Sequence, residues 1–365
     1  MMPSKLSALD RLRYLGQRAT WFALGGAFGM AYRGATSASS RPPPASVLAE
    51  LRGRFRALIA AELRNVEAGH YPRELALAPL WPALSRSLPR LVKDAPAAIA
   101  RKRRGDFKDL PAIPLEHYPA YYRRNFHWQS DGYLSEHSAE LYDITVELLF
   151  RGAADVMRRQ VLPHLSRRRH AGQPLAAVLD VGTGTGTMLE MITRSFPEVA
   201  LSGIDLSPYY TSAAQRRLAA LPPRSGSAGG RSIELVTGNA ESLPWPDDSF
   251  DAVTCVYLMH ELPRRARRNV IQEIRRVLRP GGLMVLEDSS QYADAPRLRT
   301  VLEAFPREFH EPYYLEYLTD PLPELAAECG LTVVARESHM VSMLVAATKP
   351  GAAPPTRAGG APGLI

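Results

Sequence analysis

The chain has 365 residues, 45% of them hydrophobic, and its 45 Lys and Arg outnumber its 37 Asp and Glu to give a net charge of +8. This length suits one large domain with appendages or two domains, and this hydrophobicity excludes a wholly disordered chain. Two cysteines, Cys255 and Cys329, exclude a disulfide-stapled scaffold and a four-cysteine metal site, and no metal site of any kind is predicted. No apolar run reaches the ~18 residues of a transmembrane helix. We therefore expect a globular protein of the cytoplasm, either soluble or peripheral to a membrane.

Residues 1–44 form a basic arm around a short apolar stretch. Residues 19–32 carry no charge, and they include Trp21, Phe22, Leu24, Phe28 and Met30. Three interpretations stay open. The arm is disordered or forms a helix packed on the domain, it is an interfacial anchor whose residues 19–33 contact anionic lipid, or it is an organelle-targeting peptide.

Residues 45–174 are predicted to form a helical region that covers the substrate site. Apolar residues recur at spacings of three and four between residues 45 and 108, which indicates helix. A second helix is expected over residues 139–165, where one broad face holds Leu141, Val146, Leu149, Phe150 and Val156. At the other end of the chain, residues 349–365 are rich in Pro, Gly and Ala and are expected to form a disordered tail.

From residue 175 onward, apolar segments of strand length alternate with helical segments. Strands are expected at residues 175–179, 200–204, 233–236, 252–257, 283–286, 332–335 and 340–347, with helices at 208–221 and 263–278. The insertion at residues 222–231 predicts a floppy surface loop, because it is rich in Pro, Gly and Ser. This alternation predicts an α/β fold, in which a parallel sheet carries helices on both faces.

The strongest functional signal is the glycine-rich turn after the first of these strands. Gly182, Gly184 and Gly186 precede a helix, and the lack of side chains lets a ligand approach the backbone closely. Asp205 ends the next strand, where a carboxylate can accept hydrogen bonds from ribose hydroxyls. The third glycine comes one residue earlier than in the dinucleotide-binding Gly-x-Gly-x-x-Gly motif. Asp180, just before the turn, suits a ligand with positive charge better than one with phosphates.

Further motifs follow this turn in a fixed order. They are Gly203-Ile-Asp-Leu-Ser, Gly238-Asn-Ala-Glu, Leu243-Pro-Trp-Pro-Asp-Asp-Ser-Phe-Asp and Leu278-Arg-Pro-Gly-Gly. Together with Asp180-Val-Gly-Thr-Gly-Thr-Gly, this succession resembles the class I S-adenosylmethionine-dependent methyltransferases over residues 175–348. The resemblance implies a Rossmann-like seven-stranded sheet whose last strand is antiparallel, and S-adenosyl-L-methionine as the methyl donor. It also implies that the Leu278 segment is a tight turn before the fifth strand.

The resemblance also implies which residues bind the cofactor. Asp180, Gly182, Thr183, Gly184 and Gly186 would lie on its methionine side, and Asp205 would bind the ribose. The adenine would be held by Leu206, Asn239, Ala240 and Glu241.

Within this family, the chain is most similar to the quinone-biosynthesis C-methyltransferases and other type 11 methyltransferases, through its Leu243 and Leu278 motifs. Its long N-terminal region and its Met259-His260-Glu261 segment depart from those enzymes and put a quinone substrate in doubt. Residues 125–135 are similar to a segment found upstream of the catalytic domain in uncharacterised methyltransferase-domain proteins of cyanobacteria and plastids.

Tyr257, His260 and Glu261 are the candidate catalytic residues. They follow the fourth strand, at the carboxyl edge where open α/β sheets bind ligands. His260 is a candidate general base because the ordinary pKa of histidine is near ~6.5. The alternatives are that His260 caps the following helix, bonds to the backbone, or positions the substrate.

Two aromatic clusters are the candidate substrate-binding segments. His127, Trp128 and Tyr133 precede the predicted sheet domain, and His310, Tyr313 and Tyr314 follow its fifth strand. Such rings are typical of pockets for aromatic or lipophilic molecules. The alternative is that both clusters only pack the helical region onto the domain.

Basic runs at residues 101–104, 167–169 and 264–268 raise the alternative of a nucleic-acid substrate. Solvated helix faces and loops explain such runs equally well, and no Asn-Pro-Pro-Tyr-like motif for methylation of base amino groups follows the fourth strand. We therefore predict methyl transfer to carbon or oxygen of a small aromatic or lipophilic molecule. The alternatives are an RNA or protein methyltransferase and a non-catalytic protein that binds S-adenosylmethionine.

Overall fold

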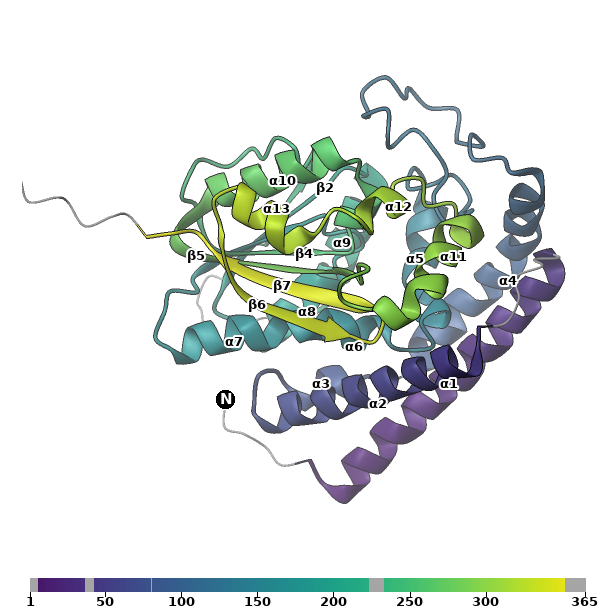
Figure 1. Ribbon diagram of the computed structural model, residues 1–365, viewed down its shortest axis with the longest axis horizontal. Helices are drawn as coiled ribbons and strands as arrows, with labels where there is room; N and C mark the ends of the chain where they lie inside the picture. The colour runs from purple at the N-terminus through teal and green to yellow at the C-terminus, as the bar shows by residue number, and fades with distance from the viewer. Residues whose placement is uncertain (1–5, 37–42, 80, 223–232, 352–365) are drawn as a thin grey trace, which may run out of the picture.

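The computed structural model describes residues 6–36, 43–79, 81–222 and 233–351. Its centre is a seven-stranded sheet with the strand order β3-β2-β1-β4-β5-β7-β6 (Figure 1). The strands are β1 (Ala177–Val181), β2 (Ala200–Asp205), β3 (Ile233–Thr237), β4 (Phe250–Val256), β5 (Leu278–Ser289), β6 (Thr332–His339) and β7 (Ser342–Thr348). Strands β1 to β5 pair in parallel, whereas β7 runs antiparallel to both β5 and β6. The predicted Rossmann-like sheet with an antiparallel last strand is confirmed.

Side chains alternate between the two faces of the sheet, and each face carries helices. On β4, for example, Val253 and Cys255 pack on one face and Ala252 on the other. The first face is covered by α10 (Arg264–Val277), α11 (Arg299–Phe309), α12 (Tyr314–Tyr317) and α13 (Leu322–Glu328), and the second by α7 (Leu162–His170) and α8 (Thr187–Ser195). Helix α9 (Pro208–Ala219) lies next to α8, β2 and β3. Short 3-10 turns are η2 (Met259–Glu261) and η3 (Pro296–Leu298).

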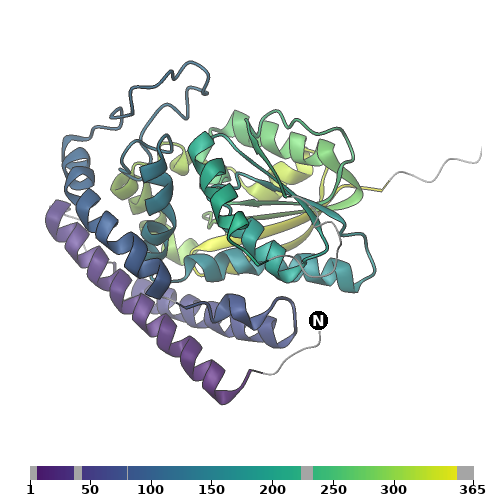
Figure 2. The same cartoon turned by 180° about the vertical axis from the view of Figure 1, so that it is seen from behind.

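The N-terminal helices form an additional layer beside this domain (Figures 1 and 2). They are α1 (Ala8–Thr36), α2 (Ala45–Glu67), α3 (Arg73–Ala76), α4 (Trp81–Arg104), α5 (Glu136–Leu149), α6 (Ala154–Arg158) and the 3-10 turn η1 (Arg159–Val161). Helices α2 and α3 contribute Ile59, Val66 and Leu75 to the core that also holds α7 and α8. A buried ion pair of 2.7 Å between Glu62 and Arg159 joins α2 to η1. Within the residues that the structure describes, no helix is long and apolar enough to cross a membrane.

The basic arm contains one long helix, α1, which packs along α5 and α4. Trp21, Leu24 and Phe28 belong to a cluster with buried leucines of α4 and α5. Arg18 is also buried, and its Nη1 donates a hydrogen bond of 2.5 Å to the carbonyl of Gly152. Of the three interpretations of the basic arm, a helix packed on the domain is therefore the one that fits residues 8–36. The expectation that the rings of residues 19–33 enter lipid is wrong for Trp21, which is buried against protein.

Several other expectations about local structure need correction. Residues 139–165 do not form one helix, because the chain turns at Arg151 and Gly152, both with positive φ, before α6 begins. A Cβ at Gly152 would lie 2.3 Å from Cβ of Trp21, so only glycine lets α1 approach this turn. The fifth strand begins at Leu278 and includes the segment that was expected to be a turn before it. Residues 352–365 of the expected tail, and residues 223–231 of the expected loop, lie outside the described residues.

Candidate functional site

A first pocket lies at the carboxyl ends of the parallel strands and holds about 520 Å³ of space free of atoms, including open solvent. Its wall is made by the segments that follow β1, β2, β3 and β4, and by an aromatic segment that precedes α5. The lining residues are Tyr121, Tyr122, Phe126, Gly182, Ile204, Asp205, Leu206, Gly238, Asn239, Ala240, Leu258, Glu261, Leu262 and Val270. Five predicted cofactor residues are among them: Gly182, Asp205, Leu206, Asn239 and Ala240. We refer to this pocket as the donor pocket.

Asp205 is held in place at the end of β2 by backbone hydrogen bonds. Its Oδ2 accepts from the N–H of Gly184 at 2.8 Å, and its Oδ1 accepts from the N–H of Ser207 at 2.9 Å. Burial raises the pKa of this carboxyl to about 6. A carboxylate acceptor fixed at the edge of this pocket fits the ribose of a nucleoside.

The glycine turn brings backbone to the same pocket. Gly182 has a φ of +70°, and a Cβ on it would come within 3.1 Å of the Leu258 side chain, which also lines the pocket. A larger residue would therefore push Leu258 or occupy the space of the ligand. Together with Asp205 and Leu206, this cradle fits S-adenosylmethionine.

The other predicted cofactor residues lie behind the pocket wall. Asp180 is buried opposite Thr254 in the sheet register, and its Oδ1 accepts a hydrogen bond of 2.6 Å from the Thr254 hydroxyl. Burial raises the pKa of Asp180 to about 6. Thr183 and Gly184 belong to the turn itself, Gly186 caps α8, and Glu241 accepts a hydrogen bond from the Tyr121 hydroxyl. For these five residues, direct cofactor contact stays a prediction.

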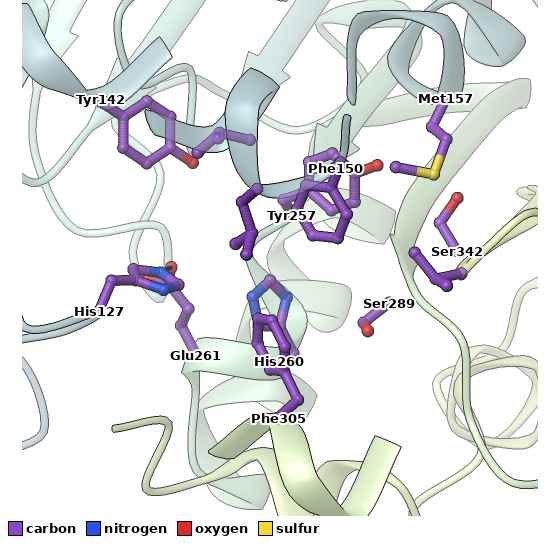
Figure 3. A pocket seen from close by; sticks show the side chains of 13 residues that line it. His127, Tyr142, Phe150, Met157, Tyr257, His260, Glu261, Ser289, Phe305 and Ser342 are labelled. Carbon is purple, nitrogen blue, oxygen red and sulfur yellow. Dashed lines mark ion pairs between the residues drawn. The ribbon is translucent and has the colours of Figure 1, made fainter. Parts of the chain in front are cut away.

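A second pocket adjoins the first, and Glu261 lines both. It holds about 480 Å³ of space free of atoms, including open solvent, and we refer to it as the acceptor pocket. Its lining residues are His127, Tyr142, Val146, Leu149, Phe150, Met157, Tyr257, His260, Glu261, Ser289, Phe305, Val341 and Ser342 (Figure 3). All three predicted catalytic residues, Tyr257, His260 and Glu261, are among them. Most of the remaining wall is apolar.

His260 lines the acceptor pocket and is oriented by Asp288. Its Nδ1 lies 2.6 Å from Asp288 Oδ1, and the other carboxylate oxygen accepts from the N–H of Met259 at 2.7 Å. Burial alone would lower the pKa of His260, but the Asp288 charge and hydrogen bond outweigh it and raise that pKa to about 9. The ring is therefore mostly protonated at neutral pH. In the neutral ring that forms near and above this pKa, Nδ1 keeps its hydrogen bond to Asp288 and Nε2 is the atom that can accept a proton.

His127 stands between two carboxylates at the junction of the pockets. Its Nε2 lies 3.0 Å from Glu311 Oε1 and 3.5 Å from Glu261 Oε1. Burial would lower the pKa of His127, but these two carboxylates raise it to about 10. Tyr133 donates a hydrogen bond of 2.5 Å to the same Glu261 oxygen. Figure 3 shows the His127 and Glu261 side chains side by side.

Of the predicted substrate-binding residues, His127 lines the acceptor pocket, but the other five do not. Trp128 donates from Nε1 to the Glu308 carbonyl at 2.9 Å, and His310 stacks on Phe107. Burial lowers the pKa of His310 to about 4, so the ring is neutral. Five of the predicted residues hold other side chains or loops in place, or pack against other rings, and do not line the pocket. They are Trp128, Tyr133, His310, Tyr313 and Tyr314. Most residues of both clusters therefore fit the alternative in which the clusters only pack the helical region onto the domain.

Sequence reasoning missed the helical wall of the acceptor pocket. Tyr142, Val146 and Leu149 come from α5, and Met157 comes from α6. The apolar face predicted for residues 139–165 was the available signal, but no pattern in it distinguishes a pocket wall from core. It also missed Tyr121 and Tyr122, which close the donor pocket.

Comparison with known proteins agrees with this geometry. Residues 178–282 match a family model described as a methyltransferase domain. The chain is 32% identical over 150 residues to the ubiquinone/menaquinone biosynthesis C-methyltransferase UbiE of Desulfotalea psychrophila, an alignment of 41% of this chain and 54% of that protein. It is 34% identical over 129 residues to a fatty-acid O-methyltransferase of Mycolicibacterium smegmatis, which is 35% of this chain and 43% of that protein. The chain thus spans about half the length of the curated relatives it matches.

Among solved structures, a methyltransferase from Methanosarcina mazei superposes with a TM-score of 0.40 at 20% identity, over 50% of this chain and 97% of that one. The ordered motifs, the seven-stranded sheet and the match to residues 178–282 agree with one another. Residues 178–282 of this chain are therefore similar to a methyltransferase domain, and the donor pocket fits S-adenosyl-L-methionine as the methyl donor.

Proposed function

We propose that this chain methylates an oxygen or carbon atom of a small aromatic or lipophilic molecule. The observation that carries the proposal is the apolar acceptor pocket, which adjoins the donor pocket at Glu261 and has His260 in its wall. An acceptor seated there would lie next to the donor, and methyl transfer requires mainly this alignment.

In the proposed reaction, His260 acts as the general base. S-adenosylmethionine, when bound, supplies an electrophilic methyl group on a sulfonium. As the acceptor oxygen or carbon forms its bond to that methyl group, the proton that it carried passes to Nε2 of His260. Asp288 holds Nδ1 at 2.6 Å, so Nε2 is the atom that takes this proton in the neutral form of the ring, whose share grows as the pH rises toward the His260 pKa of about 9. The apolar side chains of Phe150, Met157 and Phe305 exclude water from the acceptor.

The names of the relatives support a lipophilic acceptor. The two described above are named as a C-methyltransferase of ubiquinone and menaquinone biosynthesis and as a fatty-acid O-methyltransferase. The mostly apolar wall of the acceptor pocket, with a few polar side chains in it, suits a lipophilic molecule.

The basic runs give little support to a nucleic-acid substrate, because each run contains a buried arginine with structural partners. Arg101 binds Asp109 at 2.9 Å, and Arg267 binds Asp320 at 3.1 Å. Arg168 donates to the Gly281 carbonyl at 2.8 Å. These side chains hold elements together instead of presenting charge to phosphates.

The proposed substrate class is tested by methyl transfer from labelled S-adenosylmethionine. We expect label to appear in an isoprenoid hydroquinone, which carries the proton that the proposed base removes, and none in total RNA incubated under the same conditions. The label is counted after extraction into organic solvent, and a chain carrying His260→Ala serves as the control. Label in RNA or in protein but not in the extract would contradict the proposal.

We also propose that the N-terminal part of α1 contacts an anionic membrane surface, from which a lipophilic acceptor would be taken up. Leu9, Leu12 and Leu15 are 66%, 69% and 49% exposed, and Arg11 and Arg13 lie beside them on the helix. In both overall views the first turns of α1 extend beyond the rest of the molecule (Figures 1 and 2). Leucines flanked by arginines are typical of helices that lie in the headgroup region.

Replacing Leu12 and Leu15 together with glutamate is expected to abolish binding to vesicles that contain anionic lipid. The loss arises because apolar burial and attraction to anionic headgroups are both removed. Cosedimentation with vesicles of phosphatidylglycerol and phosphatidylcholine measures it. The control is Val334→Glu, which alters an equally exposed side chain on β6 and should leave binding unchanged. Equal sedimentation of the α1 variant and the wild-type chain would refute the contact.

A further inference from the structure

We propose that His127, Glu261 and Glu311 bind one divalent transition-metal ion at the junction of the donor and acceptor pockets. The three residues come from distant parts of the sequence, and the fold places their side chains together. His127 precedes α5, Glu261 ends η2 after β4, and Glu311 follows α11. One potential ligand atom from each lies within 4.8 Å of the other two.

The distances suit a shared ion. Metal–ligand bonds of ~2.0–2.2 Å that meet at about 90–110° separate ligand atoms by about 2.8–3.6 Å. His127 Nε2 lies 3.0 Å from the Glu311 oxygen and 3.5 Å from the Glu261 oxygen. One imidazole and two carboxylates form a donor set that suits Zn²⁺, Mn²⁺ or Fe²⁺.

The surroundings of Glu311 indicate that this residue binds an ion. Its side chain is fully buried, Oε1 lies 3.0 Å from His127 Nε2, and Oε2 receives no hydrogen bond from any residue that the structure describes. A buried carboxylate oxygen without a hydrogen bond is costly. Its ion-pair partner among those residues is His127, which it faces across the cluster. A divalent ion would neutralise Glu311 and Glu261 together.

The surrounding residues hold the cluster in place. Tyr133 donates to the Glu261 oxygen at 2.5 Å, which is the kind of support that orients carboxylate ligands. The loop that carries His127 is fixed by Arg101, whose Nη1 donates to the Trp128 carbonyl at 2.7 Å. Trp128 in turn donates to the Glu308 carbonyl, three residues before Glu311.

An ion at this place would deepen the proposed function, on which this part of the inference rests. Three protein ligands leave coordination positions open, as in catalytic metal sites. Glu261 and His127 both line the acceptor pocket, so an open position would face the acceptor. A hydroxyl oxygen bound there would give up its proton more readily to Nε2 of neutral His260, and the resulting oxyanion would be the better nucleophile toward the methyl group of the donor. We therefore expect the acceptor to carry a hydroxyl group that binds the ion. The methyl group is transferred either to the oxygen of that hydroxyl or to an atom next to it.

The test is calorimetric titration of the full chain, free of tags and stripped with chelator, with Zn²⁺ and with Mn²⁺. We expect one ion per chain at micromolar affinity or better, weakened about 100-fold or more by His127→Asn and by Glu311→Gln. The matched control is His137→Asn, because His137 also lies 3.1 Å from a carboxylate, that of Asp94, but at the surface. This control should bind as the wild-type chain does. Absence of binding to the folded wild-type chain, or equal binding by all variants, would overturn the proposal.

A second measurement tests the metal site with the wild-type chain alone, in case a variant of a buried residue does not fold. The wild-type chain loaded with Co²⁺ is expected to absorb visible light more strongly than the hydrated ion, and a spectrum identical to that of the hydrated ion would contradict the site. These experiments contain neither donor nor acceptor. A chain that binds the ion but transfers no methyl group to lipophilic molecules would refute the proposed function alone, and transfer without ion binding would refute the metal site alone.

Discussion

Replacing His260 with alanine is expected to lower kcat for methyl transfer by about 10²–10⁴-fold while leaving the affinity for S-adenosylhomocysteine within about twofold of wild type. The side chain lines the acceptor pocket but not the donor pocket, so its loss removes the proton acceptor and spares cofactor binding. Steady-state kinetics with the acceptor identified by the labelling assay, together with calorimetric titration, separate these two effects.

The control for this experiment is His117→Ala, because His117 is exposed and lies in neither pocket. It should leave kcat unchanged. If His260→Ala turns over as fast as wild type, His260 is not the base. If that variant instead loses cofactor affinity, the assignment of the two pockets is wrong.

Replacing Asp205 with asparagine is expected to weaken S-adenosylhomocysteine binding by about 10–100-fold. Hydrogen bonds to a charged acceptor contribute about 1.5–3 kcal/mol, and the neutral amide loses that advantage toward the ribose hydroxyls. Asparagine is preferred to alanine because its oxygen can still accept from the Gly184 N–H that fixes the turn. Calorimetric titration measures the affinity, and thermal unfolding shows that the variant is folded. The control is Asp247→Asn, whose side chain is 72% exposed.

The same residue predicts how cofactor binding depends on pH. Burial raises the pKa of Asp205 to about 6, and the charges that face it are Glu261 and Asp180, with the hydroxyls of Tyr122 and Tyr210 nearby. The ionised carboxylate is the form that accepts from both ribose hydroxyls, so affinity should be constant above pH 7 and fall as the pH drops through 6. The fall should be smaller in the asparagine variant, in which Asp180, whose pKa is also raised to about 6, is a remaining carboxyl that titrates in this range. Wild-type affinity that is equal at pH 5 and pH 8 would contradict the assignment of Asp205 to the ribose.

Much of the sheet domain could be predicted from the sequence, because buried parallel strands are short apolar runs bounded by turn residues. The runs around Leu179 and Val253 mark β1 and β4 within two residues of their observed ends. The glycine turn and Asp205 are local signals as well, since the ends of neighbouring strands meet at one edge of the sheet. The donor pocket therefore contains several of the residues expected there.

The acceptor pocket could not be predicted from the sequence, because it is formed by tertiary contacts that the periodicity of apolar residues does not indicate. The break after α5 follows from Trp21 of α1 packing at Gly152, two residues far apart in the chain. Aromatic residues such as Trp128 and Tyr314 satisfy the same pattern whether they line a pocket or pack behind it, and here they pack behind it. The residues His127, Glu261 and Glu311 have no characteristic spacing in the sequence, because they come from three separate segments of the chain.

Binding of the methyl donor is tested by calorimetric titration of the purified full chain with S-adenosylmethionine and, in parallel, with S-adenosylhomocysteine. We expect both to bind at micromolar affinity, one per chain, because Asp205, Gly182 and Leu206 form a preorganised cradle at the ends of β1 and β2. Failure of both ligands to bind to a chain that unfolds cooperatively on heating would contradict the donor pocket, and with it the proposed methyl transfer.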